Sequence, residues 1–135
     1  MNSYILWNDS YRVGIEEIDE QHRKLFEEIN NLLNAVRESL DADIVEHLLN
    51  EMTNYVDCHF RAEQLYLEKH PRFKEHYLMH WEFTRKNMEL VKMFQESRES
   101  AGREMADFLV NWLLKHVIHV DREYFLEMAD LGLLP

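Results

Sequence analysis

Two pairs of potential metal ligands stand four residues apart near the middle of the chain. His59 and Glu63 form the first pair, and His76 and His80 form the second. In a helix, residues four apart project from the same face, so each pair can bind one cation together. Either pair alone is weak evidence, because a histidine and a carboxylate at this spacing are more often a solvated, hydrogen-bonded couple.

Further ligand candidates recur on other amphipathic stretches. His22 lies near the start of one stretch, and His116 and Asp121 lie near the end of another. All five of these histidines fall on the apolar stripe of their own predicted helix. An unpaired imidazole there would cost roughly 1–3 kcal/mol per unmet polar group. Five inward histidines and two inward carboxylates therefore predict a bound cation rather than an ordinary core.

The remaining histidines and the single cysteine are expected to be bystanders. His47, His70 and His119 fall on polar faces. Cys58 directly precedes His59, so it points about 100° away from the inward face and is expected to be a packed thiol. One cysteine forms no disulfide within the chain, which agrees with a reducing compartment.

The size of the ligand set favours two metal ions over one. A tetrahedral zinc ion takes about four ligands, and structural zinc sites usually include thiolates, whereas only nitrogen and oxygen donors gather here. If Glu63 and Asp121 each bridge two ions and an oxide or hydroxide forms a third bridge, the histidines divide three to one ion and two to the other. The first ion is then closed, and the second keeps a vacant position for a diatomic molecule.

Composition favours a helical protein. The chain has 135 residues, which suits a single domain spanning 1–135, and its 30% charged residues with only three Gly and two Pro suit long amphipathic helices. The net charge of −11 disfavours nucleic acid and anionic membrane surfaces as partners. No apolar run reaches the roughly 18 residues of a membrane span, and residues 1–18 lack the pattern of a signal peptide. We therefore expect a cytoplasmic protein without direct membrane insertion.

Apolar residues at three- and four-residue spacing predict the helices. Residues 1–18 lack this spacing and are expected to form an extended arm packed on the body. Asp19 and Asp41 are the expected N-caps, Pro71 is expected in a first helical turn, and Ser97–Gly102 is expected to be a connection. The predicted helices cover about 19–38, 42–68 and 71–96, then a fourth that carries Met105 to Val120, and a short helix at about 122–130 that ends near Gly132.

Short links between such helices favour antiparallel neighbours. The predicted fold is therefore all-α, an up-down-up-down antiparallel four-helix bundle with an N-terminal arm and a short C-terminal helix. Asp121 follows His116 by five residues, about 140° round a regular helix. If both bind a metal, the helix is expected to contain a π-like turn or to loosen there.

The combined motifs resemble the hemerythrin family, specifically its bacterial single-domain members, over nearly the whole chain. The resemblance implies two iron ions, with His76, His80 and His116 on the closed iron. It also implies that His22 and His59 bind the open iron. Glu63 and Asp121 then bridge the two irons. The residues that carry the resemblance are Trp7-Asn8, Tyr11, Val13-Gly14, Ile18-Asp19-Glu20-Gln21-His22, Leu25-Phe26, His59-Phe60 with Glu63, Pro71, His76 with His80, and Trp112-Leu113-Leu114-Lys115-His116 with Asp121.

An apolar pocket for dioxygen is expected beside the open iron. Leu113 precedes His116 by three residues and leans over the same spot, and Trp112 and Phe26 are the other candidates. Most such residues in a bundle are ordinary core. Tyr66 and Tyr124 are expected either near the site or with their hydroxyls in water.

Two positions depart from the family pattern. Gln64 stands where an acid often follows the bridging Glu, and His70 stands where Tyr often precedes the Pro. Neither is a ligand position. We expect Gln64 to change a hydrogen bond to a ligand, and hence oxygen affinity or oxidation rate.

The resemblance implies reversible dioxygen binding, for storage or for delivery to an oxygen-consuming enzyme. The open iron also suits an enzyme acting on nitric oxide or peroxide, or a sensor that drives a partner. The sequence offers no acid–base residues beyond the ligands, which weighs against an enzyme. No output domain is expected, which weighs against a receptor-type sensor.

Overall fold

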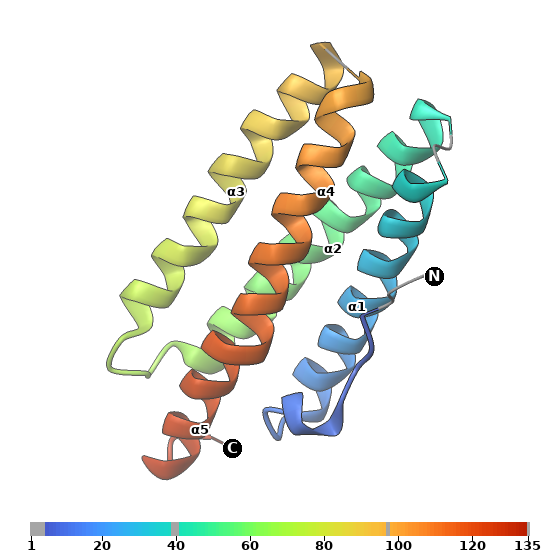
Figure 1. Cartoon of the computed structure of the whole chain (residues 1–135). Helices are drawn as coiled ribbons and strands as arrows, with labels where there is room; N and C mark the ends of the chain where they lie inside the picture. Colours follow the sequence, from blue (N-terminus) through green and yellow to red (C-terminus); the bar gives the residue numbers. More distant parts are fainter. Residues whose placement is uncertain (1–4, 39–40, 97, 135) are drawn as a thin grey trace.

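Long amphipathic helices dominate the chain, and each buries its apolar stripe against its neighbours. The computed structural model describes residues 5–38, 41–96 and 98–134, and in these ranges four long helices run antiparallel to one another in sequence order (Figure 1). The predicted all-α four-helix bundle is confirmed. The elements are η1 (Asp9–Tyr11), α1 (Glu16–Arg37), α2 (Ala42–Leu67), α3 (Phe73–Glu96), α4 (Arg98–Lys115), the π-helix η2 (His116–Asp121) and α5 (Arg122–Asp130).

The described part of the N-terminal arm packs against α1. The backbone N–H of Ile5 donates to Asn30 Oδ1 at 2.8 Å, and Asn30 Nδ2 donates back to the Ile5 carbonyl at 2.8 Å. Residues 9–11 of the arm form the 3-10 helix η1. The prediction that the arm extends to residue 18 was wrong, because residues 16–18 already belong to α1. The part of the predicted arm before Ile5 lies outside the described residues.

The prediction that Asp19 caps the first helix was wrong. Helix α1 begins at Glu16, so Asp19 lies in its first turn. The carboxylate of Asp19 instead accepts the backbone N–H of Val13 at 2.7 Å and that of Gly14 at 3.3 Å. Gly14 has a φ of +94°, a conformation that side chains disfavour, and the two hydrogen bonds hold this bend against the helix.

The starts of α2 and α3 follow ordinary capping chemistry. Asp41 is the N-cap of α2 as predicted, since its side chain accepts the Asp43 N–H at 2.7 Å. Pro71 lies before α3 rather than in its first turn. Before α3, the His70 side chain stabilises a tight turn of the backbone, because its Nδ1 accepts the Arg72 N–H at 2.8 Å.

The prediction that Ser97–Gly102 breaks the helical pattern was wrong for most of that stretch. Helix α4 already begins at Arg98, and Ser97 lies outside the described residues. Arg, Glu and Ala have high helix propensity, so a helix forms there without an apolar stripe, and the one glycine costs only about 1 kcal/mol.

The last long helical segment consists of three consecutive elements. Helix α4 leads without a break into η2 and α5, which extend it beyond the bundle's end (Figure 1). Six residues of π-helix lie in the middle, where the sequence predicted a π-like turn. Gly132 ends α5 in the left-handed conformation, and the Leu133 N–H donates to the Met128 carbonyl at 2.9 Å. These contacts form a Schellman motif.

Two hydrophobic clusters lie at different levels of the bundle. Leu25, Met52 and Leu109 belong to the larger cluster, and Ile18, Leu67 and Phe125 belong to the smaller one. Between the two clusters, the helices bury polar side chains such as His22, Glu63 and His116. Across the described ranges, every helix is too short or too polar to cross a lipid bilayer.

Candidate metal centre

The seven predicted ligands meet at the level between the two hydrophobic clusters. None of them is more than 3% exposed. An interior with this many polar groups is costly unless each group finds a partner. The side chains come from α1 (His22), α2 (His59 and Glu63), α3 (His76 and His80) and η2 (His116 and Asp121).

Their donor atoms form two groups that share both carboxylates. The three-histidine group contains His76, His80 and His116 with Glu63 and Asp121. The two-histidine group contains His22 and His59 with the same two carboxylates. Within each group, one donor atom per residue lies within 4.8 Å of all the others. Two cations that share the carboxylates would fit this arrangement.

Helical geometry accounts for the convergence. His59 and Glu63 lie one turn apart on α2, and His59 Nε2 is 3.3 Å from Glu63 Oε2. The imidazoles of His76 and His80 are also one turn apart, with ring centroids separated by 4.4 Å. These pairs face one another because each lies on the buried stripe of its helix.

Two pairs of imidazole nitrogens lie within hydrogen-bond distance of each other. His22 Nε2 is 3.1 Å from His59 Nε2, and His80 Nε2 is 3.0 Å from His116 Nε2. Each nitrogen pair has room for only one proton between its atoms. The same nitrogens point towards carboxylate oxygens, so a cation can take the place of the protons.

The carboxylates are incompletely satisfied. Asp121 Oδ2 and Glu63 Oε1 are buried and make no hydrogen bond, although an imidazole nitrogen lies 3.1 Å from each. Buried oxygen atoms with free lone pairs are costly in an apolar interior. Neutral imidazole and carboxylate donors are typical ligands of iron and zinc, and the absence of thiolates argues against a structural zinc site.

The electrostatics of the site keep both signs of charge inside the bundle. Burial alone would lower the pKa of His22, but the neighbouring carboxylates of Asp121 and Glu63 outweigh it and raise that pKa to about 9. Burial opposes the ionisation of Glu63, yet the neighbouring imidazoles, His59 first, hold its pKa well below the usual range. By contrast, burial lowers the pKa of His80 to about 4, so His80 is neutral.

Two glutamines contact the outer nitrogens of the imidazoles. Gln21 Oε1 lies 2.7 Å from His59 Nδ1, and Gln64 Nε2 lies 3.3 Å from His80 Nδ1. The sequence predicted a hydrogen bond from Gln64 to a ligand but missed Gln21. Gln21 precedes His22 on α1 while its partner lies on α2, so no spacing within one helix could have identified the contact.

Aromatic rings fix the orientation of the three-histidine group. The Phe60 ring stacks on His80 with centroids 3.7 Å apart and planes 3° apart. Trp112 stacks on His116 at 4.4 Å and 13°. Tyr124 is buried with its ring 4.7 Å from that of His76, whereas the Tyr66 hydroxyl donates to Glu17 at the surface at 2.7 Å.

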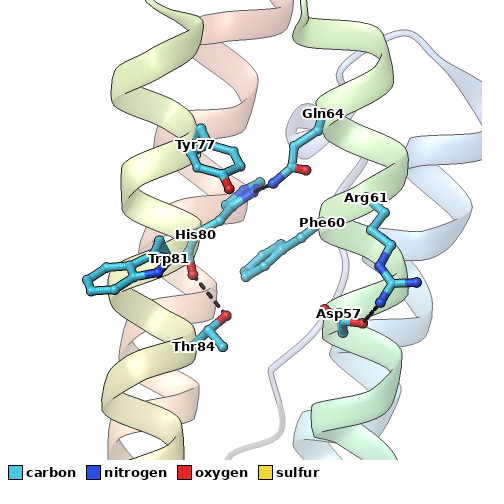
Figure 2. A pocket seen from close by; sticks show the side chains of 8 residues that line it. All are labelled: Asp57, Phe60, Arg61, Gln64, Tyr77, His80, Trp81 and Thr84. Atoms are coloured by element: carbon cyan, nitrogen blue, oxygen red, sulfur yellow. Dashed lines mark hydrogen bonds and ion pairs between the residues drawn. The ribbon is translucent and has the colours of Figure 1, made fainter.

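A solvent-open pocket of about 210 Å³ lies between α2 and α3 beside this group. Figure 2 shows Gln64, His80 and Phe60 in its wall together with Tyr77 and Trp81. The pocket also includes the ion pair between Arg61 and Asp57, at 2.7 Å. His80 is thus a proposed ligand that also borders a surface pocket.

Two of the predicted bystanders are placed differently from expectation. His70 is only 4% exposed, and its ring lies 4.4 Å from Tyr124, so the prediction that it faces solvent was wrong. It belongs to the turn before α3, where helical periodicity carries no information. Cys58 is exposed rather than packed, because its side of α2 faces away from the bundle. His47 and His119 are exposed as predicted.

Known proteins that resemble this chain share one family name. The family model "Hemerythrin HHE cation binding domain" matches residues 13–127, which include all seven proposed ligands. A bacteriohemerythrin of Clostridium acetobutylicum is 30% identical over 125 residues, covering 88% of this chain and 97% of the relative. A bacteriohemerythrin of Pseudomonas aeruginosa is 31% identical over 124 residues, covering 90% and 80%. A hemerythrin-like protein of Naegleria gruberi is 31% identical over 121 residues, covering 87% and 88%.

Proposed function

The chain belongs to the hemerythrin family, and from that premise we propose that it binds dioxygen reversibly at a centre of two iron ions. Its role in this proposal is to store dioxygen or to deliver it to an oxygen-consuming enzyme. The observation that carries the proposal is the division of one buried donor set into two unequal groups that share two carboxylates.

The unequal groups give the two irons different surroundings. His76, His80 and His116 would hold one iron, and His22 and His59 would hold the other, while both carboxylates bridge. The second iron would have one protein ligand fewer and therefore a position for dioxygen. When bound, the iron pair would supply two electrons to dioxygen, one from each ferrous ion, and would regain them when dioxygen leaves.

Apolar residues around the two-histidine group would keep water and external protons away from the dioxygen position. Leu113 and Phe26 are 1% and 2% exposed. The arm adds a cover on the two-histidine side, where Trp7 packs against Phe26 at 5.4 Å and lies 6.5 Å from His22. Trp112 completes the apolar surroundings from α4. Exclusion of water slows the irreversible oxidation of iron, so these residues serve a carrier rather than a catalyst of substrate oxidation.

The ligand set also favours mild chemistry. Ferritin-like di-iron bundles place about four Glu and two His around their metals. Here five neutral imidazoles accompany two carboxylates, so less negative charge is available to stabilise high oxidation states of iron. We infer no substrate other than dioxygen.

Anaerobic reconstitution tests the proposal. The full chain is loaded with ferrous iron, the iron content is measured, and the visible spectrum is recorded before oxygen, after oxygen and after its removal under vacuum. We expect two irons per chain and an absorption band that forms with oxygen and disappears without it. A chain that holds a single zinc, or a band that never reverses, would contradict the carrier function.

A further inference from the structure

The solvent-open pocket between α2 and α3 meets the three-histidine group. Its volume is about 210 Å³, and its lining includes His80, a proposed ligand that is only 2% exposed (Figure 2). Pockets for drug-sized molecules usually measure about 300–1,000 Å³. This pocket therefore suits a smaller molecule of one or two rings, which would lie against a ligand of the centre.

Three aromatic side chains line the pocket besides the imidazole. Tyr77 and Trp81 come from α3 and are 45% and 55% exposed, whereas Phe60 comes from α2 and is buried. Small-molecule sites are typically lined by aromatic and apolar side chains with a few polar groups among them. Aromatic rings bind flat ring systems by offset stacking or edge contacts. The lining therefore favours a planar aromatic ligand.

The charges beside the pocket balance each other. Arg61 and Asp57 form an ion pair at 2.7 Å, so each charge already has a partner. The chain as a whole carries a net charge of −11, which repels phosphate-bearing molecules such as nucleotides. Gln64 adds an amide, a group with both a donor and an acceptor for hydrogen bonds. A neutral ligand with hydroxyl or carbonyl groups fits these surroundings better than an anion.

The stacked rings of Phe60 and His80 connect the pocket to the buried donor set. Their centroids are 3.7 Å apart, and the Phe60 ring also lies 6.0 Å from that of His116. The described lining comes from α2 and α3 and includes neither His22 nor His59, beside which the dioxygen position is proposed. A molecule in the pocket would thus reach the three-histidine side of the centre without blocking dioxygen.

We propose that this pocket binds a small neutral electron donor of the hydroquinone class, which returns electrons to the irons after they have been oxidised. The inference rests on the proposed function, because it takes His80 as an iron ligand. A hydroquinone loses two electrons and two protons as it becomes a quinone. Each of two ferric ions would gain one electron and become ferrous, and both protons would pass to water at the open pocket. A carrier needs this return path, since ferric ions have no electron to lend to dioxygen.

Binding is tested first, with duroquinone, whose fully substituted ring does not add to the exposed Cys58 thiol. ¹H–¹⁵N spectra of the zinc-loaded full chain are recorded as duroquinone is added. We expect the signals of the Trp81 indole N–H and the Gln64 amide to shift until the site is saturated, while the Trp7 indole signal from the arm stays in place. Unmoved Trp81 and Gln64 signals would overturn the proposal.

Electron delivery is tested second, by mixing the oxidised, iron-loaded chain with durohydroquinone in the absence of oxygen. In the wild type, the rate of reduction should approach a limit as the donor concentration rises. Trp81→Ala removes an aromatic wall and Thr84→Phe fills the pocket, so each should slow reduction by about 10-fold at low donor concentration.

Two controls accompany these variants. Met88→Ala changes another exposed apolar side chain of α3, so it should reduce at the wild-type rate. Dithionite is a small anion that needs no aromatic wall, and it should reduce all four proteins at similar rates. Iron content and melting temperature confirm that each variant is folded and loaded.

The outcomes separate this inference from the proposed function. Equal reduction by durohydroquinone in the wild type, Trp81→Ala and Thr84→Phe would overturn electron delivery through the pocket, whereas reversible oxygenation of the same proteins would leave the carrier function intact. Conversely, pocket-dependent reduction of a chain that never releases dioxygen would contradict the carrier function alone. A wild type that takes up no iron would overturn both.

Discussion

His116 Nε2 lies 2.9 Å from Asp121 Oδ1, although a regular helix would turn residues five apart to faces about 140° apart. The π-helix η2 closes this angle. The same Asp121 oxygen lies 2.8 Å from His76 Nε2 on α3. One widened helical turn therefore brings a carboxylate to two histidines from different helices and completes the three-histidine group.

Adding a residue to this turn should destroy the centre. An alanine inserted after Ile118 would place Asp121 six residues after His116, about 240° round a regular helix, and would rotate everything after it by about 100°. The Asp121 carboxylate would then leave the site, and we expect iron content after reconstitution to fall close to zero. The measurement is iron per chain, with circular dichroism to follow helix content.

Two further variants make this result specific. Ile118→Ala keeps the register and should retain both irons. Asp121→Asn keeps the π-helix but removes the anionic bridge, and it should lose iron as the insertion does. Full iron loading of the insertion variant would show that the register between His116 and Asp121 is not needed.

Variants of ligand residues and variants of other histidines should differ in how much iron raises the melting temperature of the protein. His76→Ala should lower iron content and remove most of the gain in melting temperature on loading, because binding to the folded state alone stabilises it. His47→Ala changes an exposed side chain, so both quantities should stay as in the wild type. Calorimetry of metal-free and loaded forms measures both effects.

His70→Ala should behave in a third way. The substitution removes the acceptor for the Arg72 N–H and the ring that packs on Tyr124. We expect a loss of roughly 1–3 kcal/mol with and without metal, and unchanged iron content. An iron content as low as that of His76→Ala would place His70 among the ligands instead.

Much of the fold and of the candidate site follows from periodicity. His22, His59 and His76 were assigned inward because each shares a three- and four-residue spacing with apolar neighbours, and all three are buried. The π-helix followed from a conflict between the five-residue spacing of His116 and Asp121 and the pitch of a regular helix.

Periodicity fails where a helix has no apolar stripe or where the chain leaves the helix. Helix α4 starts on charged residues whose helix propensity alone suffices, so its first turns were missed. His70 lies in a turn whose burial depends on how the helix ends pack. Gln21 contacts a histidine on another helix, and the distance between helices is not encoded in the spacing within either one.

The metal-free chain should lose stability as the pH rises above neutrality. The buried carboxylates of Asp121 and Glu63 raise the pKa of His22 to about 9 against the effect of burial, from an ordinary value near 6.5. A group whose pKa is raised by folding contributes stability that is complete below the ordinary value and is lost as the pH rises through the folded value. We expect the melting temperature to fall by about 5 °C or more between pH 6.5 and 9.

Iron loading should remove most of this pH dependence, because a ligated His22 carries no proton on Nε2. His22→Gln provides the control: without the titrating imidazole, its metal-free form should show a smaller decline over the same range. A melting temperature independent of pH in the metal-free wild type would contradict a protonated His22.

Leu113 and Leu109 allow the proposed shielding of the open iron to be tested within one helix. Both belong to α4 and to the same hydrophobic cluster, and they are 1% and 0% exposed. Leu113 precedes His116 by three residues, whereas Leu109 lies about one turn farther from it. Replacing either with Ala should cost roughly 2–5 kcal/mol, because each leaves a cavity in a packed core.

Only Leu113→Ala should open the dioxygen position to water and anions. Both variants and the wild type are loaded with ferrous iron and oxygenated, and the decay of the visible band to the oxidised form is followed. We expect decay to accelerate in Leu113→Ala and to remain near the wild-type rate in Leu109→Ala, with iron content equal in all three. Equal decay rates in the two variants would assign Leu113 to the ordinary core, and the shielding of the iron would then have to come from Phe26 and Trp7 on the side of the arm.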